Sequence, residues 1–198
     1  MKFQNEKFYY NKYDFKTLDI QGKKTKVYRI ISKINFSTCT GKVVVEGQVG
    51  GYCALETLSD KGNCWVDNMS VVGPDCKISG NAQVERSLIA CDCQLDGKAV
   101  VLNSKLMPTS KIMLKDNSAI KNSEIRGRLQ MKDLSEISDT KFSGNAELYS
   151  DMHIENGKLI GTNKNPVVVK TNHEDNKFDY AFGTGLNLTN SKIEEKTK

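Results

Sequence analysis

The chain has 198 residues, 38% of them apolar and 27% charged, with a formal net charge of +5. This length provides one substantial core, and the low apolar content favours an elongated fold over a compact sphere. No apolar run approaches the roughly 18 residues of a membrane helix and no signal peptide is readable, so we expect a cytoplasmic protein without a membrane partner.

Residues 1–19 are interpreted as a basic, aromatic arm, in which lysines alternate with Phe8, Tyr9, Tyr10, Tyr13 and Phe15. Residues 20–57 are predicted to contain strands at 26–34 and 42–46, and Gly50-Gly51 predicts a turn between strands. We expect residues 20–57 to form an N-terminal cap, because the open end of a stack of strands must be covered.

Residues 58–165 carry a repeat. An aliphatic or aromatic residue returns every five or six positions, whereas a helix needs returns at three and four and an exposed hairpin at two. The returns are Val66, Val72, Ile78, Val84, Ile89, Leu95, Val101, Leu106, Ile112, Ile120, Ile125, Met131, Ile137, Phe142, Leu148, Ile154 and Leu159. Steps of six, six and five recur about every 17 residues, which predicts a triangular solenoid of about six three-faced coils.

The anchors of this repeat are predicted to stack in one buried column, namely Val66, Val84, Val101, Ile120, Ile137 and Ile154. Cys76 and Cys93 occupy equivalent positions and are expected to be neighbours in a second inner column. A polar register (Asn103, Asn122, Asp139 and Asn156) follows the anchors. Because Asn and Asp tolerate left-handed backbone, we expect these residues to form corners.

Residues 166–198 are predicted to supply a last strand at 167–170, a cap and a tail. The aromatic segment 178–188 is expected to cover this end of the solenoid or to pair with another subunit, and residues 191–198 are expected to be frayed.

The hexads, with corners such as Gly80-Asn81-Ala82 and Gly144-Asn145-Ala146, resemble the hexapeptide-repeat superfamily. VYRIISKINF at 27–36, VGGYC at 49–53 and LSDKGNCWV at 58–66 resemble the opening of the YdcK-like proteins of bacteria and phages, which are commonly labelled acetyltransferases. The resemblance covers residues 20 to 160. It implies an all-β chain forming a single left-handed parallel β-helix with small terminal caps, in a bacterial cell or in the host cytoplasm if phage-encoded.

The acetyltransferase label does not by itself predict catalysis, because one fold hosts many functions. Hexapeptide acyltransferases rely on a histidine base, and this chain offers only His153 and His173. His153 precedes a core anchor and His173 lies in a hydrophilic stretch, so we assign no catalytic residue and no cofactor. An acyl-CoA-dependent acyltransferase acting as a trimer is the alternative.

Two basic features are candidates for binding. The first is a flank of the middle coils, formed by Lys111, Lys115, Lys121, Arg126, Arg128 and Lys132, beside which Lys105, Lys141 and Lys158 share one register interrupted by Glu124. The second is the arm around Tyr9, Tyr10 and Tyr13, because aromatic side chains beside cations suit both protein hot spots and base stacking. We predict a non-catalytic binding module for a protein partner, of the accessory or inhibitor type found in phages and mobile elements. Nucleic acid is the second alternative, and homo-oligomerisation stays open.

The six cysteines are Cys39, Cys53, Cys64, Cys76, Cys91 and Cys93, without a CxxC motif or zinc-type Cys/His spacing. We expect reduced thiols, several of them buried, and no metal site. A metal or redox pair at Cys91 and Cys93 is the alternative. Trp65 is expected to pack under the cap.

Overall fold

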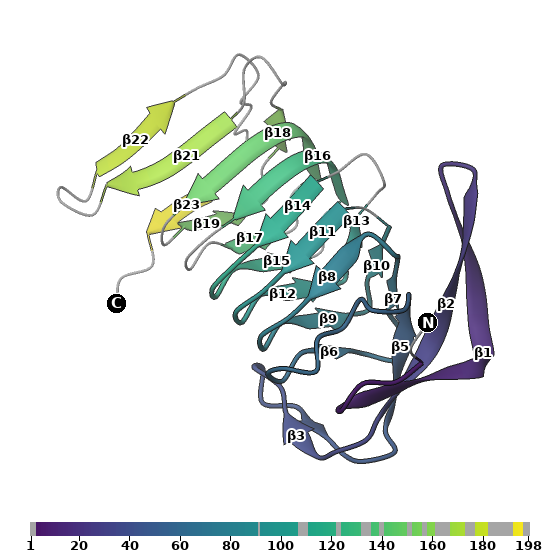
Figure 1. The fold of residues 1–198 in the computed structure, drawn as a ribbon. Coiled ribbons are helices and arrows are strands. Elements are labelled where there is room, and N and C mark those ends of the chain that lie inside the picture. The colour runs from purple at the N-terminus through teal and green to yellow at the C-terminus, as the bar shows by residue number, and fades with distance from the viewer. Residues whose placement is uncertain are drawn as a thin grey trace.

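The computed structural model describes residues 3–90, 92–106, 111–121, 124–131, 136–138, 141–149, 152–155, 158–160, 167–172, 177–181 and 192–195. Within them every regular element is a strand and none is a helix, so no helix of this part could cross a membrane. Most strands stack in parallel ladders that form a β-solenoid (Figure 1). The prediction of an all-β solenoid is therefore confirmed.

The first two ladders share long strands. One ladder stacks β5 (Val49–Cys53), β7 (Val71–Val72), β10 (Leu88–Ile89), β13 (Lys105–Leu106), β16 (Glu124–Met131), β18 (Lys141–Tyr149) and β20 (Lys158–Ile160). The second stacks β8 (Cys76–Ile78), β11 (Asp92–Leu95), β14 (Lys111–Leu114), β16, β18 and β21 (Val167–Asn172). Because β16 and β18 run through the corner between these faces, the two ladders belong to one sheet.

The third ladder carries the predicted anchor column. It stacks β6 (Trp65–Val66), β9 (Gln83–Glu85), β12 (Val100–Leu102), β15 (Ala119–Lys121), β17 (Glu136–Ser138) and β19 (Met152–Glu155). Its register aligns all six predicted anchors, Val66, Val84, Val101, Ile120, Ile137 and Ile154. The first four are fully buried, and the side chains of the last two lie outside the described part. The repeat of about 17 residues is thus confirmed as the length of one coil.

The second inner column is also confirmed, with one correction. Cys76 and Cys93 are register partners, both are buried, and neither is in a disulfide. The 17-residue spacing, however, predicts that Ile112 lies next to Leu95 in the column of Ile78. In the structure Leu95 pairs with Leu114, and Ile112 takes the place beside Cys93. The spacing between partners rises from 17 at Leu106 to 19 at Ile112, so two extra residues enter there and shift the pattern.

The corner residues follow the expected chemistry. Asn103 has a φ of 53°, and Arg86, its equivalent one coil earlier, has 46°. Beside them the backbone N–H of Ser87 donates to the Ser70 hydroxyl (3.1 Å), and that of Ser104 donates to the Ser87 hydroxyl (3.0 Å). Buried serines therefore link successive coils where the strands break. Asn122, Asp139 and Asn156 lie outside the described residues.

The N-terminal cap differs from expectation at Gly50-Gly51. Both residues lie inside strand β5 and are buried, rather than forming a turn. A Cβ at Gly50 would lie 2.8 Å from the Trp65 ring, and one at Gly51 would lie 2.5 Å from the Asp67 carbonyl oxygen. Close packing, not chain reversal, requires glycine here. Trp65 is fully buried under the cap, as predicted, with ring centroids 6.1 Å from Phe8 and 5.9 Å from Phe36.

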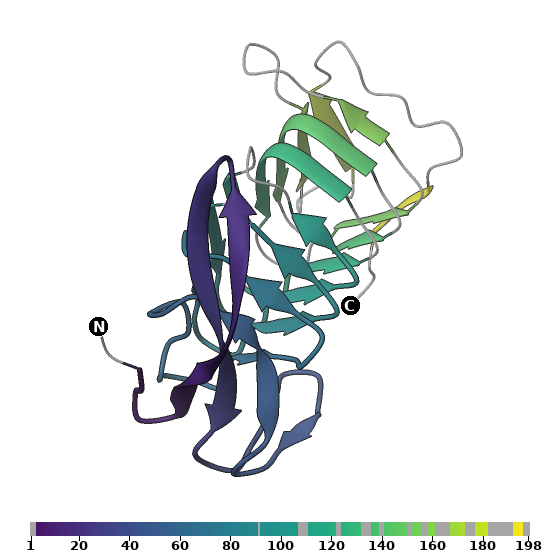
Figure 2. The ribbon, with the colours of Figure 1, turned by 90° about the vertical axis from the view of Figure 1, so that its right-hand side faces the viewer.

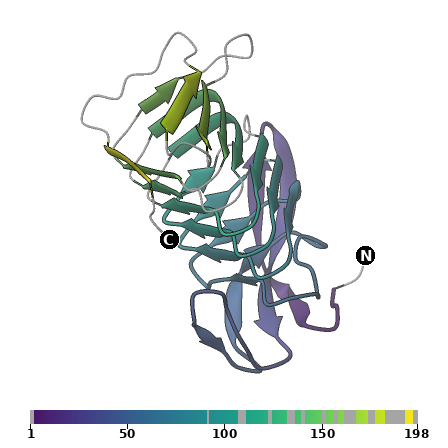
Figure 3. The same cartoon turned by 90° about the vertical axis from the view of Figure 1, so that its left-hand side faces the viewer.

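The remaining strands are antiparallel additions. At the N-terminal end β1 (Phe8–Ile20) and β2 (Lys23–Ser32) form a hairpin that continues the sheet through β5, and β3 (Phe36–Ser37) pairs with β4 (Val43–Val44). At the other end β21 extends the ladder as predicted, and β22 (Lys177–Ala181) pairs with it (Figure 3). The expectation of a frayed tail is wrong for 192–195, because β23 (Lys192–Glu195) pairs with β19.

Candidate functional site

The hairpin β1–β2 is the most distinctive surface element. Its turn residues, Gln21 and Gly22, both have positive φ (53° and 80°), as a two-residue hairpin loop requires. The sequence boundary between arm and cap, after residue 19, falls at this turn, so arm and strand 26–34 form one structural unit. The distal half leaves the cap and lies along the solenoid flank (Figure 2), where Leu18 and Val27 pack with Tyr52 and Val71.

A bulge interrupts the hairpin. Asn11 pairs with Arg29, but the next pair is Phe15 with Tyr28, so Lys12, Tyr13 and Asp14 have no partner in β2. The backbone N–H of Tyr13 donates to Asn11 Oδ1 (3.0 Å), which turns the chain outward. The Tyr13 side chain is 83% exposed, the highest value among the exposed large hydrophobic residues in the described part. A bulge re-aims side chains locally, and here it projects a tyrosine into solvent.

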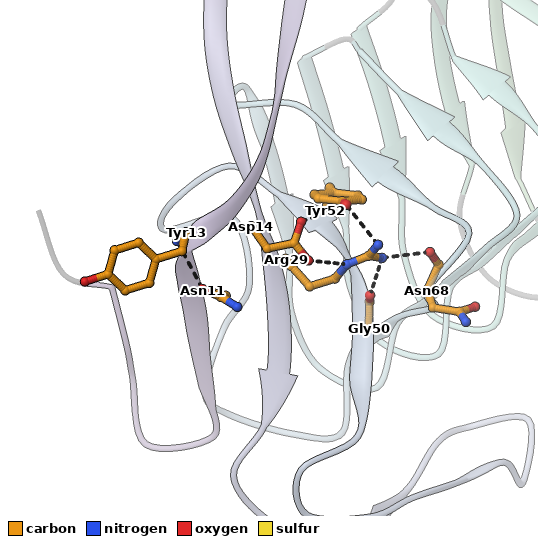
Figure 4. Close-up of polar contacts among 7 residues, drawn as sticks. All are labelled: Asn11, Tyr13, Asp14, Arg29, Gly50, Tyr52 and Asn68. Carbon is orange, nitrogen blue, oxygen red and sulfur yellow. Dashed lines mark hydrogen bonds and ion pairs between the residues drawn. The ribbon is translucent and has the colours of Figure 1, made fainter.

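Asp14, at the end of the bulge, is held by Arg29 and Tyr52. The Arg29 Nε lies 3.4 Å from Asp14 Oδ2, and the Tyr52 hydroxyl donates to Asp14 Oδ1 (2.9 Å). The Arg29 guanidinium also donates to the carbonyl oxygens of Gly50 and Asn68 (3.0 Å each) and to the Tyr52 hydroxyl (2.9 Å). Figure 4 shows Asp14 directed into this cluster and Tyr13 away from it. The ion pair thus ties the bulge to β2, and the Tyr52 hydrogen bond ties it to β5.

An open groove of about 1140 Å³ lies beside the bulge. Tyr9 is 40% exposed at its wall, and Lys12 and Lys33 supply cations. The lining residues are Phe3, Gln4, Asn5, Glu6, Tyr9, Tyr10, Asn11, Lys12, Tyr13, Ile31, Lys33 and Asp60. Glu6 and Asp60 balance the charges of these two lysines. Exposed tyrosine side chains beside a groove with a polar rim are typical of protein-contact sites.

Of the three predicted arm tyrosines, Tyr9 and Tyr13 are on this surface and Tyr10 is not. Tyr10 is only 5% exposed and belongs to the core cluster with Phe8 and Ile30. Burial raises the pKa of its phenol. Alternation along β1 explains the difference, because successive side chains point to opposite faces of a strand. The Tyr10 ring therefore stabilises the cap and offers little surface to a partner.

Lys7 is another arm residue that lies inside. Its ammonium donates to the Gly62 carbonyl and to Asn63 Oδ1 (3.3 Å), and it lies 3.7 Å from the Phe36 ring centroid. Burial lowers the pKa of this lysine. Lys7 therefore fastens the start of the chain to the first turn of the solenoid rather than contributing to the surface charge.

The edge of β1 is open beyond the bulge. β1 stands at the end of the strand order, and the bridge from Gln4 to Tyr9 covers only its beginning. In the part of the chain that the structure describes, no strand pairs with the outer edge of residues 11–20. A bulge and charged side chains, here those of Lys12, Asp14 and Lys16, disfavour non-specific pairing of such an edge with strands of other molecules.

The basic coil flank is described only in part. Lys111 and Arg128 are register partners, and Lys105, Glu124, Lys141 and Lys158 share one register, as the sequence predicted. Lys115 is half-buried in the turn after β14. Lys121 and Arg126 lie in β15 and β16 with undescribed side chains, and Lys132 lies outside the described residues.

The other sequence candidates are placed as follows. His153 lies in β19 opposite Glu136, with its side chain undescribed, and His173 and Cys91 lie outside the described residues. Among the side chains that are described, no group of three or more His, Cys, Asp or Glu residues could hold a metal ion.

Sequence reasoning missed the cluster of Asp14, Arg29 and Tyr52. Two of its members lie in segments that the sequence singled out, Arg29 in VYRIISKINF and Tyr52 in VGGYC. Their shared location in strands that pair directly could have suggested contact. Asp14 carried no such signal, because its position depends on the bulge.

The chain was compared with known proteins. No protein-family model matches it, and no curated protein matches it either.

Proposed function

We propose that the chain is a non-catalytic protein-binding module that contacts its partner through Tyr9 and Tyr13 of the hairpin. The observation that carries the proposal is the bulge, which exposes Tyr13 while Asp14 is fixed to Arg29. A tyrosine that the backbone already presents to solvent needs little rearrangement of the chain to meet a partner, and tyrosine is enriched among hot-spot residues. The groove beside it provides the surrounding surface.

The solenoid is the rigid support for this surface. We take it to be a left-handed β-helix of six hexapeptide-type coils, on the strength of the hexads and the resemblance to YdcK-like proteins. The same resemblance supports a cytoplasmic protein of a bacterium or phage, acting as an accessory or inhibitor of another protein.

Co-purification tests the proposal. The tagged chain is expressed in its native cell in three versions: unchanged, with Tyr9→Ala and Tyr13→Ala, and with the control pair Val43→Ala and Val45→Ala. The control valines are exposed and do not line the groove. We expect the tyrosine variant to lose about tenfold or more of a co-purifying protein that the control retains, at equal melting temperature. Equal recovery by both variants would exclude this surface.

Nucleic-acid binding is the second candidate, favoured by the register pairing of Lys111 with Arg128 on adjacent coils. Its contact surface is the basic coil flank. Charge reversal of Arg126, Arg128 and Lys132 to Glu then weakens binding, and affinity falls steeply with salt, by roughly one unit of log–log slope per phosphate contact. A protein contact through the tyrosines shows a much shallower salt dependence.

A further inference from the structure

Strand β2 extends at its N-terminal end beyond the strand it pairs with, β5. The two pair from Ile31 with Val49 to Tyr28 with Cys53. After Cys53 the chain turns away, with Glu56 at a φ of 63°. In the described part of the chain, residues 23–27 of β2 therefore have β1 on one side and no strand on the other. Unpaired strand edges present backbone donors and acceptors that a further strand can use.

A second groove, of about 370 Å³, runs along this edge. Lys24, Thr25 and Lys26 all line it. Because consecutive side chains of a strand point to opposite faces, three consecutive lining residues mean that the groove faces the edge of β2 rather than one of its faces. The backbone of β2 is therefore one wall of the groove.

The opposite wall is apolar. It consists of Ala54, Leu55 and Pro74, and the half-buried Tyr28 closes the end where β2 and β5 meet. Proline has no backbone N–H, so this wall offers packing more than pairing. A groove with a strand edge on one side and apolar side chains on the other suits a single extended segment.

The charge around the groove selects the kind of segment. The residues that line the groove carry two positive charges, those of Lys24 and Lys26, and no negative charge. Lys26 is held in place, 4.3 Å from the Phe15 ring centroid. A second copy of this chain fits poorly, because antiparallel pairing of two β2 edges sets lysines opposite lysines.

We propose that this groove binds an acidic, extended peptide segment of a partner protein, which adds to β2 as a further strand. This site is separate from the tyrosine surface and does not depend on it. Acidic side chains of the segment face Lys24 and Lys26, and its alternate apolar side chains pack on Leu55 and Pro74.

The test uses the full chain and a fluorescent peptide of alternating glutamate and valine, about seven residues long, as in an ordinary strand. Binding is followed by fluorescence anisotropy. Two further peptides carry backbone N-methyl groups, one on its odd-numbered residues and the other on its even-numbered residues. Because a strand edge pairs with only every second residue of its neighbour, we expect one methylated peptide to lose binding and the other to keep it.

Substitutions of lining residues test whether the peptide binds in this groove. Lys24→Glu with Lys26→Glu is expected to weaken binding of the peptide about tenfold or more. The control Lys42→Glu with Lys98→Glu, which alters exposed lysines outside the groove, is expected to change the affinity less than about twofold. Tyr13→Ala is expected to leave the affinity unchanged, which separates this site from the tyrosine surface. A peptide of alternating lysine and valine is expected not to bind.

Several outcomes would overturn the proposal. One is equal binding of both methylated peptides, which means that no backbone pairing occurs. Others are binding that survives charge reversal at Lys24 and Lys26, a dimer formed through this edge, and tighter binding of a single-stranded oligonucleotide in competition with the peptide. The methylated peptides decide the matter even if the charge-reversed variant fails to fold.

Discussion

Replacing Arg29 with alanine removes the anchor of the bulge. The guanidinium donates to two carbonyl oxygens and to the Tyr52 hydroxyl, and it forms an ion pair with Asp14. The side chains of Arg29 and Asp14 are 19% and 45% exposed, so solvent screens the ion pair, which contributes only about 0.5 kcal/mol. The larger loss of stability comes from the Gly50 carbonyl oxygen, which is buried and would lose its hydrogen bond from Arg29 at a cost of about 1–2 kcal/mol.

We therefore expect Arg29→Ala to lower the free energy of unfolding by about 1.5–2.5 kcal/mol in urea titrations followed by circular dichroism. Arg29→Lys keeps the charge but not the fork of donors, and should recover less than half of the loss. A double-mutant cycle with Asp14→Ala should give a coupling of about 0.5 kcal/mol. A coupling of zero in this cycle would refute the view that Arg29 holds the bulge through Asp14, and a loss below about 0.5 kcal/mol for Arg29→Ala would contradict the contribution of its hydrogen bonds.

Three further predictions concern the core and the alternative activity. Val101→Ala, inside the anchor column, should cost about 2 kcal/mol in the same titration, whereas the exposed Val43→Ala should cost less than about 0.5 kcal/mol; equal effects would contradict the stacking. Burial raises the pKa of the Cys64 thiol from 9.0 to about 11. Between pH 9 and 11 the folded state therefore keeps a proton that the unfolded chain loses. Because of this difference the free energy of unfolding falls by about 1.4 kcal/mol per pH unit as the pH rises through this range. Cys64→Ala should remove that part of the slope, and an unchanged slope would contradict it. Acetyl-CoA should not raise the melting temperature; a saturable rise lost in His153→Ala would favour the acyltransferase.

The columns of the solenoid could be predicted because a parallel stack converts a sequence repeat directly into spatial register. One coil of residues separates Val84 from Val101, and that separation alone places them as neighbours. The error at Ile112 has the same cause. An insertion moves every later position, and an apolar residue in the wrong column looks as regular in the sequence as one in the right column.

The hairpin was harder to predict. Phe8 and Tyr10 are buried while Tyr9 is exposed, an alternation that the sequence contains but that a dense run of aromatic residues conceals. The bulge has no sequence signature, because it depends on Asp14 reaching Arg29 across the hairpin. Gly50-Gly51 suggested a turn, whereas the requirement for glycine comes from Trp65 and Val66 packing against the strand, which only the folded chain reveals.

Site-specific photo-crosslinking tests the central claim most directly. A benzophenone amino acid replaces Tyr13 in one variant and the exposed Lys98, on a solenoid turn, in another, and both are irradiated in the native cell. If the hairpin is the contact surface, the position 13 variant forms a discrete adduct with one protein, and Arg29→Ala in the same chain reduces its yield. An adduct at position 98 with none at position 13 would contradict the proposed contact surface.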